Sequence, residues 1–93
     1  MTPVTERGRV YTAVLWPDRS DGSSGYVVVI PTFRGCVSQA SSIRKAKNTI
    51  RGVARGYITD MHTHGELIPK DTGPGRDARR KGARIERVWV PFR

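Results

Sequence analysis

The sequence has little cysteine, few acidic side chains and no long apolar run. Its one cysteine in 93 residues, Cys36, cannot form an internal disulfide, which excludes a stapled secreted scaffold. Apolar runs such as Tyr26 to Ile30 are far shorter than the ~18–20 residues that span a membrane. Residues 1–6 lack the basic and apolar regions of a signal peptide. We therefore expect a cytoplasmic protein without a membrane partner.

Basic residues outnumber acidic ones by more than two to one. The chain has 17 Lys and Arg against 8 Asp and Glu, a net charge of +9. The net charge is +1 over residues 1–40, +3 over residues 41–68 and +5 over residues 69–93. Clustered cations favour a polyanionic partner such as DNA or RNA, because binding releases condensed counterions. A solvated basic surface that serves solubility explains the same charge equally well.

The pattern of apolar residues predicts a single domain over residues 1–93, with an α+β fold in the order β-β-β-α-β. The stretches with strand character are residues 9–16, 26–30, 36–39 and 83–92. The first two flank a polar turn and predict a hairpin, and the third predicts an edge strand. A right-handed crossover through the helix would place the last strand parallel to one of the first three. We therefore expect a small mixed sheet with one amphipathic helix packed on one face.

Helical spacing is the strongest structural signal. Ser41 and Ser42 offer N-caps, and apolar residues then recur at i, i+3, i+4 and i+7, which predicts a helix from about residue 42 to 61. The predicted core residues are Tyr11, Val14, Tyr26, Val28, Ile30, Ile43, Ala46, Ile50, Val53, Tyr57 and Val88.

Two groups of cations are candidates for binding nucleic acid or a partner protein. The outer side of the predicted helix carries one group, and a flexible basic loop over about residues 69–82 carries the other. The candidate residues are Arg44, Lys45, Asn48, Arg51, Arg55, Arg79, Arg80 and Lys81. Gly52 and Gly56 lie on the same outer side of the helix. Their spacing either allows close approach of another molecule or has no functional meaning.

The residues that could carry chemistry do not form a recognisable catalytic or metal site. His62 and His64 are weak metal candidates, because no third ligand stands at a metal-binding spacing and exposed polar residues are common at a helix end. Cys36 has the surroundings of a small buried hydrophobe. The carboxylates are scattered, and no nucleophile or phosphate-loop motif is present. We expect no enzymatic activity, no cofactor and no metal.

One combination of segments resembles a known family. The run from Gly25 to Gln39 contains Ile30-Pro31-Thr32-Phe33-Arg34-Gly35-Cys36, a capped helix follows, and His64-Gly65-Glu66-Leu67-Ile68-Pro69 comes after it. This arrangement resembles the HicB antitoxin-like domain over about residues 9–69. The stretch 83–92 fits the closing strand of that family.

The resemblance implies a partial ribonuclease-H-like fold that lacks the catalytic carboxylates of the nuclease. It implies a partner as well, a small messenger-RNA-cleaving toxin that the domain binds and neutralises. Many members add a DNA-binding segment, which we expect this chain to lack because it stops after the closing strand. The chain has Ile43-Arg44-Lys45 where the family usually has an acidic pair. A nucleic-acid-binding module, or a homo-oligomer paired through strand edges with Trp16 or Trp89, are the alternative hypotheses.

Overall fold

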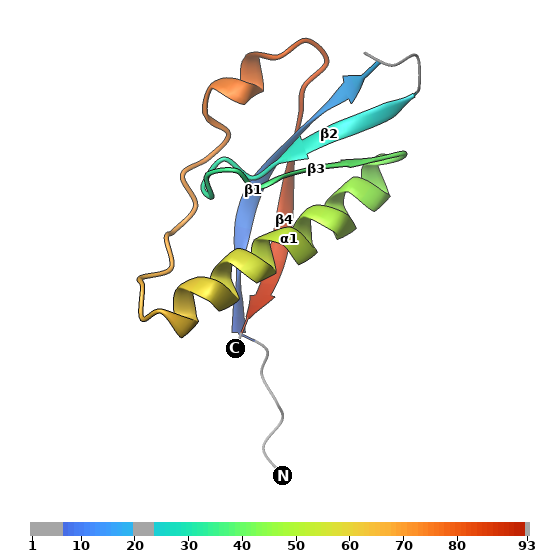
Figure 1. Ribbon diagram of the computed structural model, residues 1–93. Helices are drawn as coiled ribbons and strands as arrows, with labels where there is room; N and C mark the ends of the chain where they lie inside the picture. The colour runs from blue at the N-terminus through green and yellow to red at the C-terminus, as the bar shows by residue number, and fades with distance from the viewer. Residues whose placement is uncertain (1–6, 20–23, 93) are drawn as a thin grey trace.

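The computed structural model describes residues 7–19 and 24–92. The elements in chain order are β1 (Arg7–Asp18), β2 (Gly25–Val29), β3 (Val37–Ala40), α1 (Ile43–Thr63), the 3-10 helix η1 (Gly75–Arg79) and β4 (Arg84–Phe92) (Figure 1). The predicted α+β class and the order β-β-β-α-β are confirmed. Part of the predicted polar turn, residues 20–23, lies outside the described residues.

The four strands form one sheet in the order β3-β2-β1-β4, in which every neighbouring pair is antiparallel. The prediction of a mixed sheet is therefore wrong. β4 pairs antiparallel with β1 over nine residue pairs, from Arg7↔Phe92 to Leu15↔Arg84. β3 lies at one edge, as the sequence predicts, one residue later than expected.

The path of residues 64–83 explains the direction of β4. This segment runs beside β1 in the direction of β1, so the chain has already returned along the sheet when β4 begins (Figure 1). The successive contacts are Ile68 with Arg9, Asp71 with Thr12, Arg80 with Trp16 and Gly82 with Pro17. The crossover rule applies to a connection between two parallel strands of one sheet. Here the chain first returns along the sheet in an irregular segment, residues 64–83, which we call the return segment. β4 then runs antiparallel to β1.

One face of the sheet packs against α1. Successive strand side chains point to opposite faces, and Tyr11, Ala13 and Leu15 belong to the core cluster. The helix contributes its buried stripe to the same cluster, namely Ala46, Ile50, Ala54 and Ile58. Of the predicted core residues, Tyr11, Val28, Ile30, Ala46, Ile50 and Val88 are fully buried there, whereas Tyr26, Ile43, Val53 and Tyr57 are half-buried. Val14 is buried too, but alternation places it on the opposite face of the sheet.

Capping sets the bounds of α1. The extended backbone of Ser42 lets its hydroxyl oxygen accept a hydrogen bond from the Lys45 amide at 3.1 Å. The helix ends two residues beyond the predicted position, at Thr63, and Gly65 follows with a φ of 69°, which suits glycine. Within the described ranges, no helix is both long and apolar enough to cross a membrane.

The turn between β2 and β3 is held by backbone hydrogen bonds and by aromatic packing. Ile30 N donates to Cys36 O at 3.1 Å, and Phe33 N donates to Ile30 O at 3.0 Å. Gly35 has a φ of 80°, and a Cβ at that position would lie 3.0 Å from the Tyr57 hydroxyl. The Phe33 ring lies 4.8 Å from the Tyr11 ring and 5.8 Å from the Tyr57 ring, centroid to centroid. This turn therefore joins sheet and helix.

Candidate functional site

The outer side of α1 carries most of the predicted binding residues. We call Arg44, Lys45, Asn48, Arg51 and Arg55 the basic helix face. All but Arg51 are exposed, and Arg51 is half-buried. The stripe of alanine and isoleucine on the other side of the helix faces the sheet, so the helical period turns these polar residues toward solvent. The structure thus brings five of the eight predicted residues together on one helix.

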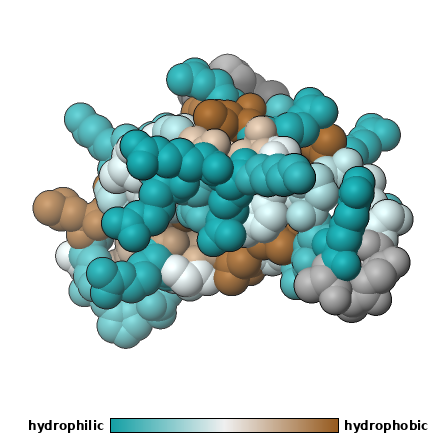
Figure 2. All heavy atoms as spheres, turned by 90° about the horizontal axis from the view of Figure 1, so that it is seen from above, coloured by the Kyte–Doolittle hydropathy of each residue, from teal (hydrophilic) through white to brown (hydrophobic). Residues whose placement is uncertain are grey.

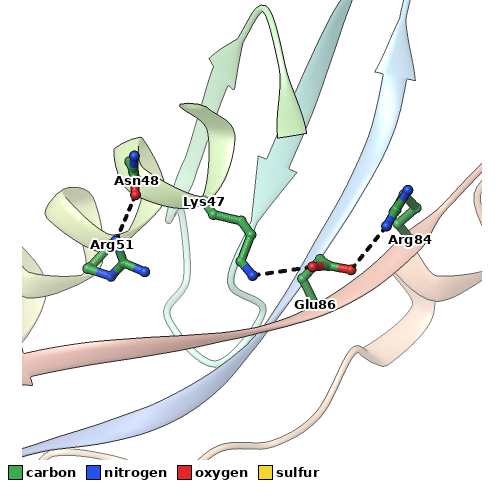
Figure 3. Close-up of polar contacts among 5 residues, drawn as sticks. All are labelled: Lys47, Asn48, Arg51, Arg84 and Glu86. Atoms are coloured by element: carbon green, nitrogen blue, oxygen red, sulfur yellow. Dashed lines mark hydrogen bonds and ion pairs between the residues drawn. The ribbon is translucent and has the colours of Figure 1, made fainter. Parts of the chain in front are cut away.

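Arg51 connects the basic helix face to the edge of the sheet. Its Nε donates to the backbone oxygen of Trp89 in β4 at 2.8 Å, and its Nη1 donates to Asn48 Oδ1 at 2.8 Å. Figure 3 shows the contact between the Arg51 and Asn48 side chains on neighbouring turns of the helix. These two bonds hold the guanidinium in place, so Asn48 acts on this face by orienting Arg51.

A second polar group lies between α1 and β4. Lys47 Nζ lies 3.3 Å from Glu86 Oε1, and Arg84 Nη2 lies 3.6 Å from Glu86 Oε2 (Figure 3). Glu86 thus lies between two cations and partly neutralises both. Ion pairs of this kind at a surface contribute about 0–1 kcal/mol each. Lys47 is therefore engaged with the sheet, unlike its exposed neighbour Lys45.

Gly52 and Gly56 have no side chains, so they leave a shallow depression on the basic helix face. A Cβ added at Gly52 or at Gly56 would meet no atom within 4 Å. Neither glycine is therefore required by packing inside the molecule, although each weakens a helix by up to about 1 kcal/mol relative to alanine. The space above them is open to a molecule that approaches the basic helix face.

The loop cations lie apart from the helix cations. Arg80 Nε lies 2.8 Å from Asp77 Oδ1, and its guanidinium carbon lies 4.2 Å from the centre of the Trp16 ring. Trp16 neighbours Leu15 in β1, so alternation places its side chain on the face of the sheet that α1 does not cover. Arg80 thus packs over the opposite side of the sheet, and Arg79, Arg80 and Lys81 are all exposed. The structure does not bring the two predicted groups into one surface.

The segment that leads into this loop is anchored to β1. Arg9 Nη1 donates to Ile68 O at 2.8 Å, and the Tyr11 hydroxyl donates to Pro69 O at 2.6 Å. Asp71 then accepts hydrogen bonds from Thr12 N at 3.0 Å and from Thr12 Oγ1 at 2.6 Å. These contacts lie along the part of β1 before Val14, which does not pair with β2. The flexibility predicted for residues 69–82 stays a prediction.

Asp71 is a structural carboxylate, although in the sequence it is only one of several scattered acidic residues. Partial burial alone would raise its pKa, but hydrogen bonds from the Thr12 side chain and amide, from the Gly73 amide and from Thr32 outweigh that effect. The net result is a lowered pKa. Its partner Thr12 lies 59 residues away, so no local pattern in the sequence announces the pair.

The two histidines and the cysteine do not form a metal or catalytic site in the described part of the chain. His64 Nδ1 lies 2.8 Å from Asp60 O, and this backbone contact, followed by the charge of Asp60, raises the His64 pKa. No group of three potential metal ligands occurs in the described part of the chain, and His62 is exposed. Cys36 is buried as predicted, and burial raises its thiol pKa to about 11 against the smaller effect of its hydrogen bond with the Ile30 backbone.

Exposed apolar side chains form a further surface, of which only Trp89 is a candidate contact residue on the evidence of the sequence. Val10 and Trp89 are paired across β1 and β4, and each is 42% exposed. Ile85 is 54% exposed, and its strand position places it on the same face, away from α1. We call Val10, Ile85 and Trp89 the outer apolar surface. In β4, the alternation of Ile85 and Trp89 with the buried Val88 is the sequence signal for this surface. Figure 2 shows hydrophobic patches between hydrophilic side chains in the view from above.

Comparisons with known proteins give two matches. No family model matches the chain. UPF0150 protein Ta0767 of Thermoplasma acidophilum is 36% identical over 61 residues, which make up 66% of this chain and 84% of that protein. The N-terminal domain of Burkholderia pseudomallei antitoxin HicB, a crystal structure, matches with a TM-score of 0.66 at 23% identity. The match covers 85% of this chain and 94% of that chain, and it establishes the fold.

Proposed function

The chain belongs to the UPF0150 family and has the HicB fold, and we propose from this that it is an antitoxin that binds and neutralises a small messenger-RNA-cleaving toxin. The observation that carries the proposal is the match of the fold over 94% of the HicB N-terminal domain. The role is a binding role and not an enzymatic one. We infer a cytoplasmic location, where the messenger RNA that such a toxin cleaves is found.

The motif run that resembles the HicB family has a structural basis that supports the proposal. Residues 25–40 form β2, the turn around Phe33 and β3, and residues 64–69 lead from α1 to the anchor on β1. The turn places Phe33 in the core between Tyr11 and Tyr57. The buried residues of this motif therefore build the scaffold, and a partner would contact exposed residues of the domain.

The outer apolar surface is the part of the molecule best suited to a toxin. A toxin that grips RNA is basic, so contact with the basic helix face would bring like charges together and cost affinity. Val10, Ile85 and Trp89 are neutral, are exposed and lie on the face of the sheet opposite to that helix. The exposed Arg87, between Ile85 and Trp89 in β4, adds one positive charge to this face. Exposed apolar residues at the centre of an interface supply much of its binding energy.

Co-expression with the product of an adjacent small open reading frame tests the proposal. We expect the two proteins to purify together and the antitoxin to relieve the growth arrest that the toxin causes. The double substitution Val10→Gln and Ile85→Gln should abolish both effects. Leu67→Gln is the matched control, because Leu67 is 95% exposed and lies outside the sheet. Absence of co-purification together with unrelieved growth arrest for the wild-type chain would refute the proposal.

A further inference from the structure

The basic helix face carries three cations, Arg44, Lys45 and Arg55, that are not held by ion pairs within the described part of the chain. Between residues 43 and 59, α1 carries five cations and no carboxylate. Arg44 and Lys45 lie in the first turn, where the helix dipole favours acidic side chains. Since these positions oppose helix stability, their charge is suited to an anionic ligand outside the molecule.

We propose that the basic helix face binds duplex DNA through its phosphate backbone. This inference is independent of the toxin, because it uses the opposite side of the sheet from the outer apolar surface. The apolar stripe of α1 is buried against the sheet, so the helix has no apolar face to insert into an anionic membrane. The basic helix face has no aromatic residue on which unpaired bases could stack. Tyr57, the nearest aromatic residue in sequence, is half-buried and packs against Phe33.

The shape of the helix favours B-form DNA over an RNA duplex. An α-helix with its side chains is about 10–12 Å wide, which fits the major groove of B-form DNA, about 12 Å wide. The major groove of an A-form RNA duplex is too narrow for side chains to read. Arg44 and Arg55 are eleven residues apart, or about 16 Å along the helix, and duplex DNA carries one charge per about 1.7 Å of its axis. Several phosphates therefore lie within reach.

Gly52 and Gly56 allow the close approach that this binding mode requires. The space above both residues is open, and Arg51 and Arg55 precede them directly in the helix. Arg51 is held by Trp89 O and Asn48, which leaves Arg44, Lys45 and Arg55 as the cations available for phosphate. With three contacts, the logarithm of the association constant should fall with the logarithm of the salt concentration at a slope of roughly −2.7.

Fluorescence anisotropy of the full chain with a labelled DNA duplex of about 16 base pairs, titrated from about 50 to 300 mM NaCl, tests the proposal. The double variant Arg44→Glu and Arg55→Glu should lose at least about tenfold in affinity, and its salt slope should flatten by roughly 1.8. Lys70→Glu together with Arg76→Glu is the control, because it changes the net charge equally at two exposed positions in the return segment. The control should lose less than about threefold.

A neutral variant separates binding from folding. Gly52→Gln together with Gly56→Gln should raise Tm, because glycine disfavours a helix, and should still weaken DNA binding several-fold by blocking close approach. Equal losses in the two charge variants would show attraction by net charge alone and overturn the site. No binding of the wild-type chain at about 50 mM salt would overturn the proposal, and so would tighter binding of an RNA duplex, a single strand or anionic vesicles. None of these outcomes depends on co-purification with a toxin.

Discussion

Asp71 and Thr12 are joined by two hydrogen bonds across 59 positions of sequence: Thr12 N donates to Oδ1 at 3.0 Å, and Thr12 Oγ1 donates to Oδ2 at 2.6 Å. Thr32 Oγ1 donates to the same carboxylate at 3.2 Å. Asp71 thus takes the place of a strand neighbour beside β1, where β2 has ended. The bonds fix the start of the return segment and so help to determine the direction in which β4 runs.

Asp71→Ala should destabilise the fold. Thr12 is 7% exposed, so removal of the carboxylate leaves a buried amide and hydroxyl without their partner. An unsatisfied buried group of this kind costs about 1–3 kcal/mol. Chemical denaturation followed by circular dichroism measures the change, and Asp77→Ala at the other end of the segment provides a comparison with a smaller expected loss. A free energy of unfolding unchanged by Asp71→Ala would contradict the role of this contact.

The contribution of Asp71 to the stability of the fold should depend on pH in the acid range. Its pKa in the folded protein is lowered from the ordinary value of 3.8, in spite of the opposing effect of burial, because hydrogen bonds favour the ionised form. A carboxylate with a lowered folded pKa stabilises the fold above its unfolded pKa and loses that effect as the pH falls through the folded pKa. The difference in Tm between the wild-type chain and Asp71→Ala should therefore shrink below about pH 4. A constant difference from pH 7 to pH 3 would rule out this linkage.

Cys36 should be inert in the native protein. It is 2% exposed, and burial raises the pKa of its thiol to about 11, so almost no thiolate forms at pH 8. A disulfide reagent such as Ellman's should react slowly with the folded chain and rapidly in about 6 M guanidinium chloride, where the thiol regains an ordinary pKa. Equal rates in the two conditions would contradict the packing around the turn between β2 and β3.

The homo-oligomer expected from the exposed strand edges should form through β3 and not through β4. Arg51 already occupies the Trp89 oxygen at the outer edge of β4, and Pro91 in the same strand has no amide hydrogen to donate. Sedimentation velocity at about 10 µM should detect an oligomer, and Val37→Lys in β3 should shift it toward monomer while Ile85→Lys in β4 should not. A wild-type monomer at that concentration would remove the expectation.

Local patterns explain which parts of the fold could be predicted from sequence. The apolar spacing of α1 and the serine before it are short-range signals, and the helix lies within two residues of its predicted bounds. The antiparallel pairing of β4 with β1 could not be predicted from such patterns, because it depends on the path of residues 64–83. That path is fixed by contacts such as Asp71 with Thr12 and Arg80 with Trp16, between residues far apart in the chain.

In the candidate site, too, local patterns could be predicted from the sequence and long-range contacts could not. The helical period places Arg44, Lys45, Asn48 and Arg55 correctly on one exposed face. The engagement of Arg51 with Trp89 depends on tertiary packing and could not be predicted. Of the outer apolar surface, only Trp89 could be singled out from the sequence, as a residue that pairs between subunits, because the exposure of Val10 and Ile85 depends on how the strands pair and on what covers them.

An assay of RNA cleavage by the purified product of the adjacent reading frame tests the central claim most directly. Equimolar addition of this chain should abolish cleavage of a messenger RNA. The double variant Val10→Gln and Ile85→Gln should leave cleavage unaffected, whereas Leu67→Gln should inhibit as fully as the wild-type chain. Cleavage that proceeds undiminished in the presence of excess wild-type chain would contradict the antitoxin function.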